Sequence, residues 1–186
     1  MPVTIYVVGG MVLMLAVWAL LTYNRLVSLR NFCRESWADI DTELKRRYDL
    51  IPNLVAVVKG YAAHEKGIFE EVARLRQICI GATGSPAQQA GPENALVHAL
   101  GKLLAVVESY PELKASEQFL ALQRELVNTE DRLQAARRFF NGNVREMNNL
   151  VQTVPSNVIA RLFGFTAGEF FEVDTPGERG AINTTF

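Results

Sequence analysis

The chain has 186 residues and a net charge of −1, a length that suits one domain with a core and an accessory segment. Its 19 lysines and arginines are spread along the sequence rather than clustered. A nucleic-acid-binding protein needs a concentrated basic face, so this distribution argues against a nucleic-acid partner. Cys33 and Cys79 lack the spacing of a metal or redox motif, and we interpret them as small buried apolar residues.

The N-terminal segment is strongly apolar. Residues 3–22, VTIYVVGGMVLMLAVWALLT, contain no charge, and as a helix they extend about 30 Å, the hydrocarbon thickness of a bilayer. No basic residue precedes them and no small-x-small cleavage site follows, as a cleaved signal peptide would require. Trp18 and Tyr23 are placed as an aromatic interface belt. The sequence therefore predicts an uncleaved single-pass anchor over residues 1–23.

The charges that flank this anchor predict its orientation. Arg25, Arg30 and Arg34 follow the apolar span, whereas only the terminal amine precedes it. Under the positive-inside rule, the part after the anchor lies in the cytoplasm and a short N-terminus lies outside. We therefore expect a single-pass protein of the cell (inner) membrane, with the lipid bilayer as its first partner.

Apolar residues recur at heptad spacing after the anchor, and only Pro52 interrupts the pattern, where it would bend the helix. The first helix is therefore predicted to leave the membrane without a break and to run to about residue 62. A second helix is predicted over about 65–80 and a third over about 93–109, with a surface loop at Gly81–Pro92 between them. The repeat of the first helix consists of Trp37, Leu44, Ile51 and Val58.

A fourth helix is predicted from Pro111 to Pro155, because an apolar heptad pattern continues over this whole stretch. The predicted fold is all-α: the transmembrane helix continues into an antiparallel up-and-down four-helix bundle at 24–163, with two long and two short helices. A Phe-rich tail is predicted at 164–186. The repeat of the fourth helix consists of Phe119, Leu126, Leu133, Phe140, Met147 and Val154.

The predicted helix lengths imply a partly uncovered stalk. At 1.5 Å per residue the two short helices are each about 25 Å long and the fourth is about 65 Å. The short pair can therefore cover only the half of the bundle that is away from the membrane, and an uncovered apolar stripe commonly marks an interface. We expect self-association through side chains of the stalk, which include Leu26, Cys33, Phe140 and Met147.

Arg47 occupies a seam position of the first helix, where a charge is costly unless it has a partner. The register places Glu130 of the fourth helix opposite it. The sequence predicts a polar lock that fixes the register of two long helices; a substrate or lipid head-group site is the alternative. The predicted lock consists of Arg47, Asp49, Glu130 and Arg132, with Asp131, Glu125 and Arg124 as alternative partners.

Catalytic and metal-binding motifs are incomplete. His64 begins the string HEKG, but Ile68 stands where the second histidine of a zinc HExxH motif would be. Neither a phosphate-binding loop nor a nucleophile elbow is present, and a nucleophile, a base and an orienting group cannot be assembled. The sequence predicts no enzyme, no metal and no cofactor.

Phenylalanine is concentrated at the start of the tail. The residues are Phe163, Phe165, Phe170 and Phe171. A descending fourth helix would deliver them near the bilayer surface. Either they pack back onto the stalk, or they form an interfacial foot or a subunit contact.

Several long strings resemble the LemA family: LKRRYDLIPNLVAVVKGYAAHE, then YPELKAS and FLALQRELVNTEDRLQAARRFFNGNVREMNNLVQTVPSNVIARLFGF, and the terminal FFEV. RRFFN, REMNN and QTVP stand where the family commonly has other aromatic residues, which indicates a divergent branch. The resemblance implies a bacterial single-pass membrane protein with a four-helix bundle and a short N-terminus outside. It implies no established catalytic activity.

The leading interpretation is a membrane-anchored, non-catalytic scaffold that forms homo-oligomers and presents its bundle to membrane protein partners. The alternative is a binding or sensing module that recognises a small ligand or peptide at the tip of the bundle away from the membrane. Residues at this predicted tip are His64, Glu65 and Tyr110.

Overall fold

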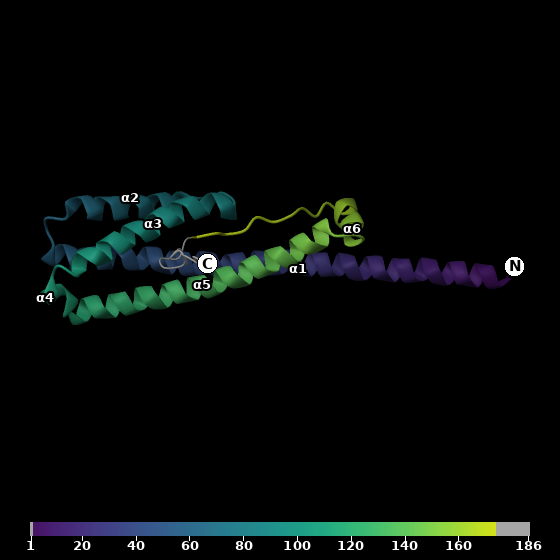
Figure 1. Ribbon diagram of the computed structural model, residues 1–186, viewed down its shortest axis with the longest axis horizontal. Helices are drawn as coiled ribbons and strands as arrows, with labels where there is room; N and C mark the ends of the chain where they lie inside the picture. Colours follow the sequence, from purple (N-terminus) through teal and green to yellow (C-terminus); the bar gives the residue numbers. More distant parts are fainter. Residues whose placement is uncertain (1, 174–186) are drawn as a thin grey trace, which may run out of the picture. The chain divides into compact units, whose positions relative to one another are not determined.

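The computed structural model describes residues 2–173, and these contain helices and no strand (Figure 1). The predicted all-α fold class is confirmed. In chain order the helices are α1 (Pro2–Tyr61), α2 (Lys66–Gly81), α3 (Pro86–Val107), α4 (Pro111–Lys114), α5 (Glu117–Gln152) and α6 (Ser156–Leu162).

α1 is one unbroken helix of 60 residues that includes Pro52. Its N-terminal part is long and apolar enough to cross a membrane, by length and composition. Further along the same helix, Leu44, Ile51 and Val58 are buried at the predicted seven-residue spacing. The predicted continuity from the apolar span to about residue 62 is therefore confirmed.

α3 begins earlier than predicted, so the predicted loop at Gly81–Pro92 is wrong over most of its length. Ser85 is the N-cap residue, and the Gln88 side chain accepts a hydrogen bond from the Ser85 backbone N–H at 3.1 Å. Pro86 occupies the first helical turn, where its missing N–H costs nothing. This start signal outweighs the glycines and prolines that suggested a loop.

The predicted fourth helix is divided in the structure. The short helix α4 ends at Lys114, and α5 begins at Glu117, after Ser116 accepts a hydrogen bond from the Phe119 backbone N–H at 3.4 Å. The heptad positions of α5 are buried as predicted, from Phe119 to Met147. Val154 is 81% exposed, because α5 has already ended before it.

The chain forms two compact units. Unit 1 consists of Met1–Ala38 with Arg138–Glu169, and unit 2 consists of Asp39–Arg137 with Phe170–Phe186. α1 and α5 each contribute one part to both units. The other helices of the two units differ: unit 1 contains α6, and unit 2 contains α2, α3 and α4.

The core of unit 1 is an apolar cluster, and it corrects the expectation of an uncovered stalk. Leu26 and Met147 are buried together with Ile159, Ala160 and Phe165, which α6 and the residues after it supply. Phe140 is buried against the Trp37 ring at a centroid distance of 5.3 Å. Cys33 is half-buried. The expectation failed because it counted four helices and left α6 out.

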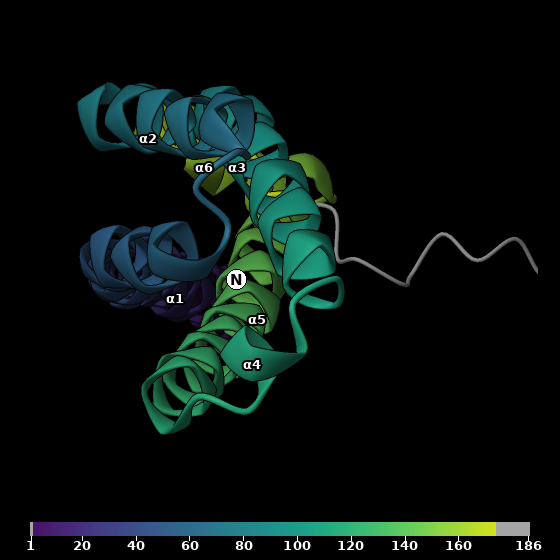
Figure 2. The same ribbon diagram turned by 90° about the vertical axis from the view of Figure 1, so that its left-hand side faces the viewer.

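The core of unit 2 is formed around α2 and α3, which lie side by side (Figure 2). Because the two helices are joined by a short connection, their apolar faces meet and also cover the parts of α1 and α5 in this unit. The buried apolar side chains include Ile51, Leu54, Phe69, Val72, Leu75, Leu96, Leu100, Leu103, Leu126 and Leu133.

Candidate functional site

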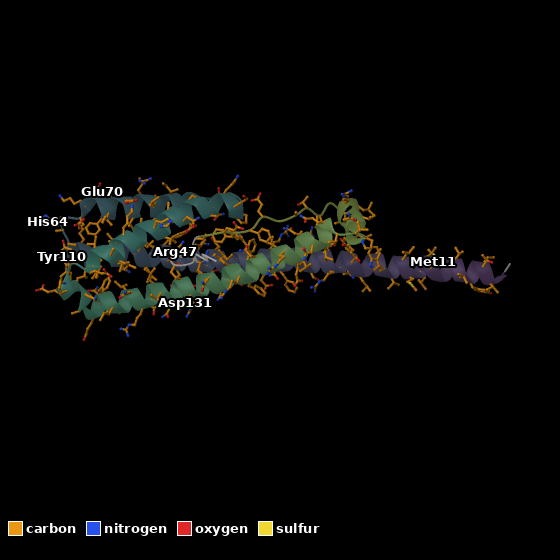
Figure 3. The ribbon with its side chains drawn as sticks, viewed as in Figure 1. Met11, Arg47, His64, Glu70, Tyr110 and Asp131 are labelled. Atoms are coloured by element: carbon orange, nitrogen blue, oxygen red, sulfur yellow. The ribbon has the colours of Figure 1, made fainter. Side chains whose placement is uncertain are left out.

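A buried charge cluster lies inside unit 2. Arg47 of α1 has 0% of its surface exposed, although it is the largest of the fully buried side chains. Its Nη1 donates to Glu130 Oε1 of α5 at 2.9 Å, and its Nη2 donates to Glu93 Oε2 of α3. Figure 3 shows Arg47 within the helices of unit 2. The ion pair between Arg47 and Glu130 that the register predicted is therefore present.

Glu93 and Arg76 extend this cluster to all the long elements of unit 2. The Tyr48 hydroxyl donates to Glu93 Oε1. Arg76 of α2 donates from Nε to the Tyr48 backbone carbonyl at 2.6 Å. The buried charge cluster, as we use the term below, consists of Arg47, Tyr48, Arg76, Glu93 and Glu130.

The sequence analysis missed Glu93, although it is only 1% exposed. The predicted third helix began at residue 93, which would put this side chain at a frayed helix end. The start of α3 at Pro86 instead places it two turns inside the helix, on the face that carries Leu96 and Leu100. The Ser85-Pro86 pair, with Gln88 after it, was the signal that could have located it.

Burial and charge together set the protonation of the cluster. Burial by itself lowers the pKa of Arg47, but Glu130 and Glu93 more than offset this, so the pKa is raised and the guanidinium stays charged. Burial, followed by the negative charge of Glu93, raises the pKa of Tyr48. The hydroxyl therefore keeps its proton and continues to donate to Glu93.

Cys79 packs near the same carboxylate and is not a nucleophile. Its side chain is buried, and burial together with Glu93 raises the pKa of the thiol to about 12. Thiolate is the reactive form, so Cys79 is inert at neutral pH. Within residues 2–173, no group of three or more histidine, cysteine, aspartate or glutamate side chains is placed to hold a metal ion.

The other two predicted members of the polar lock are not part of the cluster. Asp49 and Arg132 are both exposed, and among the described residues neither forms an ion pair. The alternative of a head-group site at Arg47 is also wrong, because a fully buried guanidinium cannot reach a lipid or a substrate. The contacts of Arg47 are those of a structural ion pair.

The predicted tip residues His64, Glu65 and Tyr110 do not line the groove at this end of unit 2. His64 is exposed and Glu65 is half-buried, and Figure 3 shows His64 and Tyr110 at the end of unit 2 where α1 gives way to α2. An open groove of about 720 Å³ lies between the end of α1 and the start of α5. It is lined by Asn53, Ala56, Val57, Gly60, Tyr61, Ser116, Gln118, Ala121 and Leu122.

The four tail phenylalanines divide evenly between buried and exposed positions. Phe165 and Phe171 are buried, in unit 1 and unit 2 respectively, and they pack back onto the helices. Phe163 is 54% exposed and Phe170 is 39% exposed. The Phe163 ring still contacts Tyr23, at a centroid distance of 4.6 Å. Phe165 and Phe171 therefore pack back as one alternative predicted, and Phe163 and Phe170 present ring surface of the kind that the other alternative requires.

These features define a class: helical proteins in which, among the described residues, one helix that is long and apolar enough to cross a membrane continues into a domain with a buried, charge-paired arginine. The sequence model of the LemA family matches residues 36–186, so the chain belongs to the LemA family, as its sequence predicted. It is 25% identical over 188 residues to magnetosome protein MamQ of Magnetospirillum gryphiswaldense, covering 88% of this chain and 69% of that protein. Magnetosome protein MamQ 2 of Paramagnetospirillum magneticum is 26% identical with the same coverage. Neither the family description nor these names state a catalytic activity.

Proposed function

We propose that this protein is a membrane-anchored, non-catalytic helical scaffold that self-associates and presents its helical domain to partner proteins at the cell (inner) membrane. The proposed division is an anchor at 1–23, a LemA-like bundle at 24–163 and a Phe-rich tail at 164–186. The bundle is an antiparallel up-and-down bundle of two long and two short helices. The pairs Arg25–Glu146 and Trp37–Phe140 support an antiparallel course of α1 and α5.

The observation that carries this proposal is the continuity of α1. One helix of 60 residues includes both the apolar span and the Arg47 side chain of the buried charge cluster. The anchor and the domain are therefore joined through helical backbone. This connection supports a scaffold whose domain stays attached to the bilayer, where membrane partners can meet it.

The orientation rests on charge. Arg25, Arg30 and Arg34 follow the apolar span within the distance over which the positive-inside rule acts. This charge distribution supports the proposal that the bundle lies in the cytoplasm and the N-terminus outside.

Self-association is supported by two exposed aromatic rings of unit 1. Phe32 of α1 is 44% exposed and Phe139 of α5 is 61% exposed. Phe139 lies one turn from Asn143, whose side-chain amide donates to the Phe32 backbone carbonyl at 3.4 Å. The two rings thus belong to neighbouring turns of the two helices. Aromatic residues are enriched at protein interfaces.

The experiment that tests the scaffold is a mass measurement of the full-length protein after extraction into lipid nanodiscs or mild detergent. We expect a mass above that of one chain, and a lower mass for the double variant Phe32→Ser with Phe139→Ser. Val127→Ser is the matched control, since Val127 is 52% exposed but lies in unit 2. A monomer mass in both environments would refute self-association, and release from membranes by alkaline washing would refute the anchor.

The buried charge cluster is proposed to fix the register of α1 against α3 and α5. Arg47 can satisfy Glu93 and Glu130 together at only one relative position of the three helices. Buried polar pairs set register in helical assemblies at some cost in stability. Asp49 and Arg132 have no part in this proposal.

A second candidate function is recognition of a small ligand or peptide at the end of unit 2, which the groove beside Tyr61 and Gln118 favours. Selection of peptides from a displayed library on the full-length protein tests it. Binding that is lost in Tyr61→Ala, and retained in Ile78→Ala on another exposed surface, would support the candidate. A library without binders would remove it.

A further inference from the structure

α6 and the residues on either side of it expose an unusual amount of apolar surface. Within ten residues of chain, Val154 is 81% exposed, Val158 62%, Leu162 73% and Phe163 54%. Val154, Val158 and Leu162 recur at intervals of four, so the last two form a stripe along one face of α6. Single exposed apolar residues are common, but a contiguous set marks a contact surface.

This stripe is held rigidly rather than left loose. The opposite face of α6 is buried in the apolar cluster of unit 1 through Ile159 and Ala160. The helix ends in a Schellman motif: Phe165 N–H donates to the Ala160 carbonyl at 2.9 Å, and Gly164 adopts φ 70°. Phe165 then returns to the same cluster. Exposure of Val158 and Leu162 is therefore a fixed feature of unit 1.

The position of α6 along the anchor identifies what covers the stripe. The cluster that α6 joins also receives Trp18 and Tyr23, which end the uncharged span. The Tyr23 ring contacts Phe163 at 4.6 Å and Phe165 at 6.0 Å. In a chain anchored by this span, tryptophan and tyrosine at its end lie at the level of the lipid headgroups. α6 is therefore packed against the part of α1 that meets the bilayer surface.

The charges of unit 1 agree with a lipid surface. Between residues 1–38 and 138–169 the chain carries six arginines and three glutamates, with no lysine or aspartate. Arg161 is exposed on α6 itself, between Val158 and Leu162 in sequence. The guanidinium carbon of Arg30 (Cζ) lies 5.0 Å from the centroid of the Phe165 ring. A basic excess next to exposed apolar residues is typical of segments that lie in a membrane interface.

We propose that α6 is an interfacial foot: Val154, Val158, Leu162 and Phe163 insert into the bilayer surface beside the anchor. The occupant of this apolar face is lipid rather than a second copy of the chain. Two points of attachment, the anchor and the foot, would then fix the rotation of α1 about its own axis as well as its depth. The inference rests on the proposed membrane anchoring and adds a second, separate lipid contact to it.

Nitroxide spin labels on the full-length protein in phosphatidylcholine–phosphatidylglycerol vesicles test the foot. Labels are placed by Val158→Cys and Leu162→Cys after Cys33→Ala and Cys79→Ala, with the helical content of each variant checked by circular dichroism. Collision with oxygen and with a water-soluble nickel complex reports immersion, and we expect both labels at roughly 5–10 Å below the headgroup boundary. Ala167→Cys and Arg145→Cys are matched controls, because both residues are exposed in the same unit, and their labels should report water.

A label at Leu13→Cys separates failure of the foot from failure of the anchor. If Leu13 reports lipid while positions 158 and 162 report water, the foot is overturned and the anchor stands. If positions 158 and 162 are shielded from both collision partners, protein covers them, and the face belongs to a second copy instead of lipid. If Leu13 itself reports water, the anchoring on which the foot depends is also overturned.

Discussion

Units 1 and 2 are built on the same two helices, α1 and α5, and both have apolar cores, yet among the described residues the fully buried charges, Arg47 and Glu93, lie in unit 2. Unit 1 buries an apolar cluster, with Leu26, Leu29, Met147 and Phe165 among its members. Unit 2 buries a fully desolvated arginine between two carboxylates. The difference teaches that the covering elements, α6 in one unit and α2 with α3 in the other, decide what a long helix pair can bury. α6 adds only apolar contacts to the cluster of unit 1, whereas α3 adds Glu93 to an apolar core and so gives the buried Arg47 a partner.

The largest effect should come from breaking the charge cluster. Arg47→Leu leaves Glu93 buried without its cation, and we expect the free energy of unfolding to fall by about 3–5 kcal/mol. Urea denaturation of the detergent-extracted protein, followed by circular dichroism, measures it. The double variant Arg47→Leu with Glu93→Leu removes both charges and should recover much of the loss. Arg132→Leu, at an exposed position, should stay within about 0.5 kcal/mol of the parent. A single variant as stable as the parent would contradict the cluster's structural role.

The apolar core of unit 1 offers the matching test. Phe165→Ala removes a ring that is 7% exposed in the cluster, and we expect a loss of about 3 kcal/mol. Hydrogen exchange should show the loss in the amides of α6, while the amides of α2 and α3 keep their protection. Phe163→Ala, whose ring is 54% exposed, is the control and should cost less. Equal loss of protection in both units would show that they unfold together.

A substitution in the turn after α6 should lower stability by a smaller amount, and a glycine inside α5 provides a control that should raise it. Gly164 has φ 70°, so Gly164→Ala forces a side chain into the left-handed region and should cost about 1–2 kcal/mol. Gly142 lies inside α5, and a Cβ added there meets nothing within 4 Å. Gly142→Ala should therefore stabilise the protein, by about 1 kcal/mol. Thermal unfolding of the two variants measures both effects. Melting temperatures that shift equally in the same direction would contradict the prediction.

High pH should weaken unit 2 selectively and modestly. The pKa of Cys79 is raised from 9.0 to about 12, so between these values the folded chain holds a proton that the unfolded chain has released. Stability is then fully present below pH about 9 and falls as the pH rises towards about 12. The raised pKa of Tyr48 acts in the same direction. Denaturation midpoints at pH 8 and pH 11 measure the fall, and Cys79→Ala should reduce it. A stability that is unchanged at pH 11 would contradict the assignment.

Local patterns predicted much of this protein. An uncharged stretch of bilayer length and a seven-residue repeat are properties of neighbouring residues, and they located α1 and the buried positions of α5. The position of Arg47 in a seam required a partner, and helix register placed that partner near residues 127–131, where Glu130 was the best candidate. Family membership followed from ordered strings of residues. These features depend on the chain's own periodicity, so the sequence determined them without knowledge of the fold.

Tertiary structure decided the rest. Glu93 became the second partner of Arg47 only because α3 starts at Pro86 and packs where α1 can reach it. Leu26 and Met147 are covered because α6, a helix of seven residues, returns to them. The packing of α6 also decides which apolar residues stay exposed, because Val158 and Leu162 lie opposite the face that α6 buries. Burial depends on which elements meet in space, and short-range patterns do not contain that information.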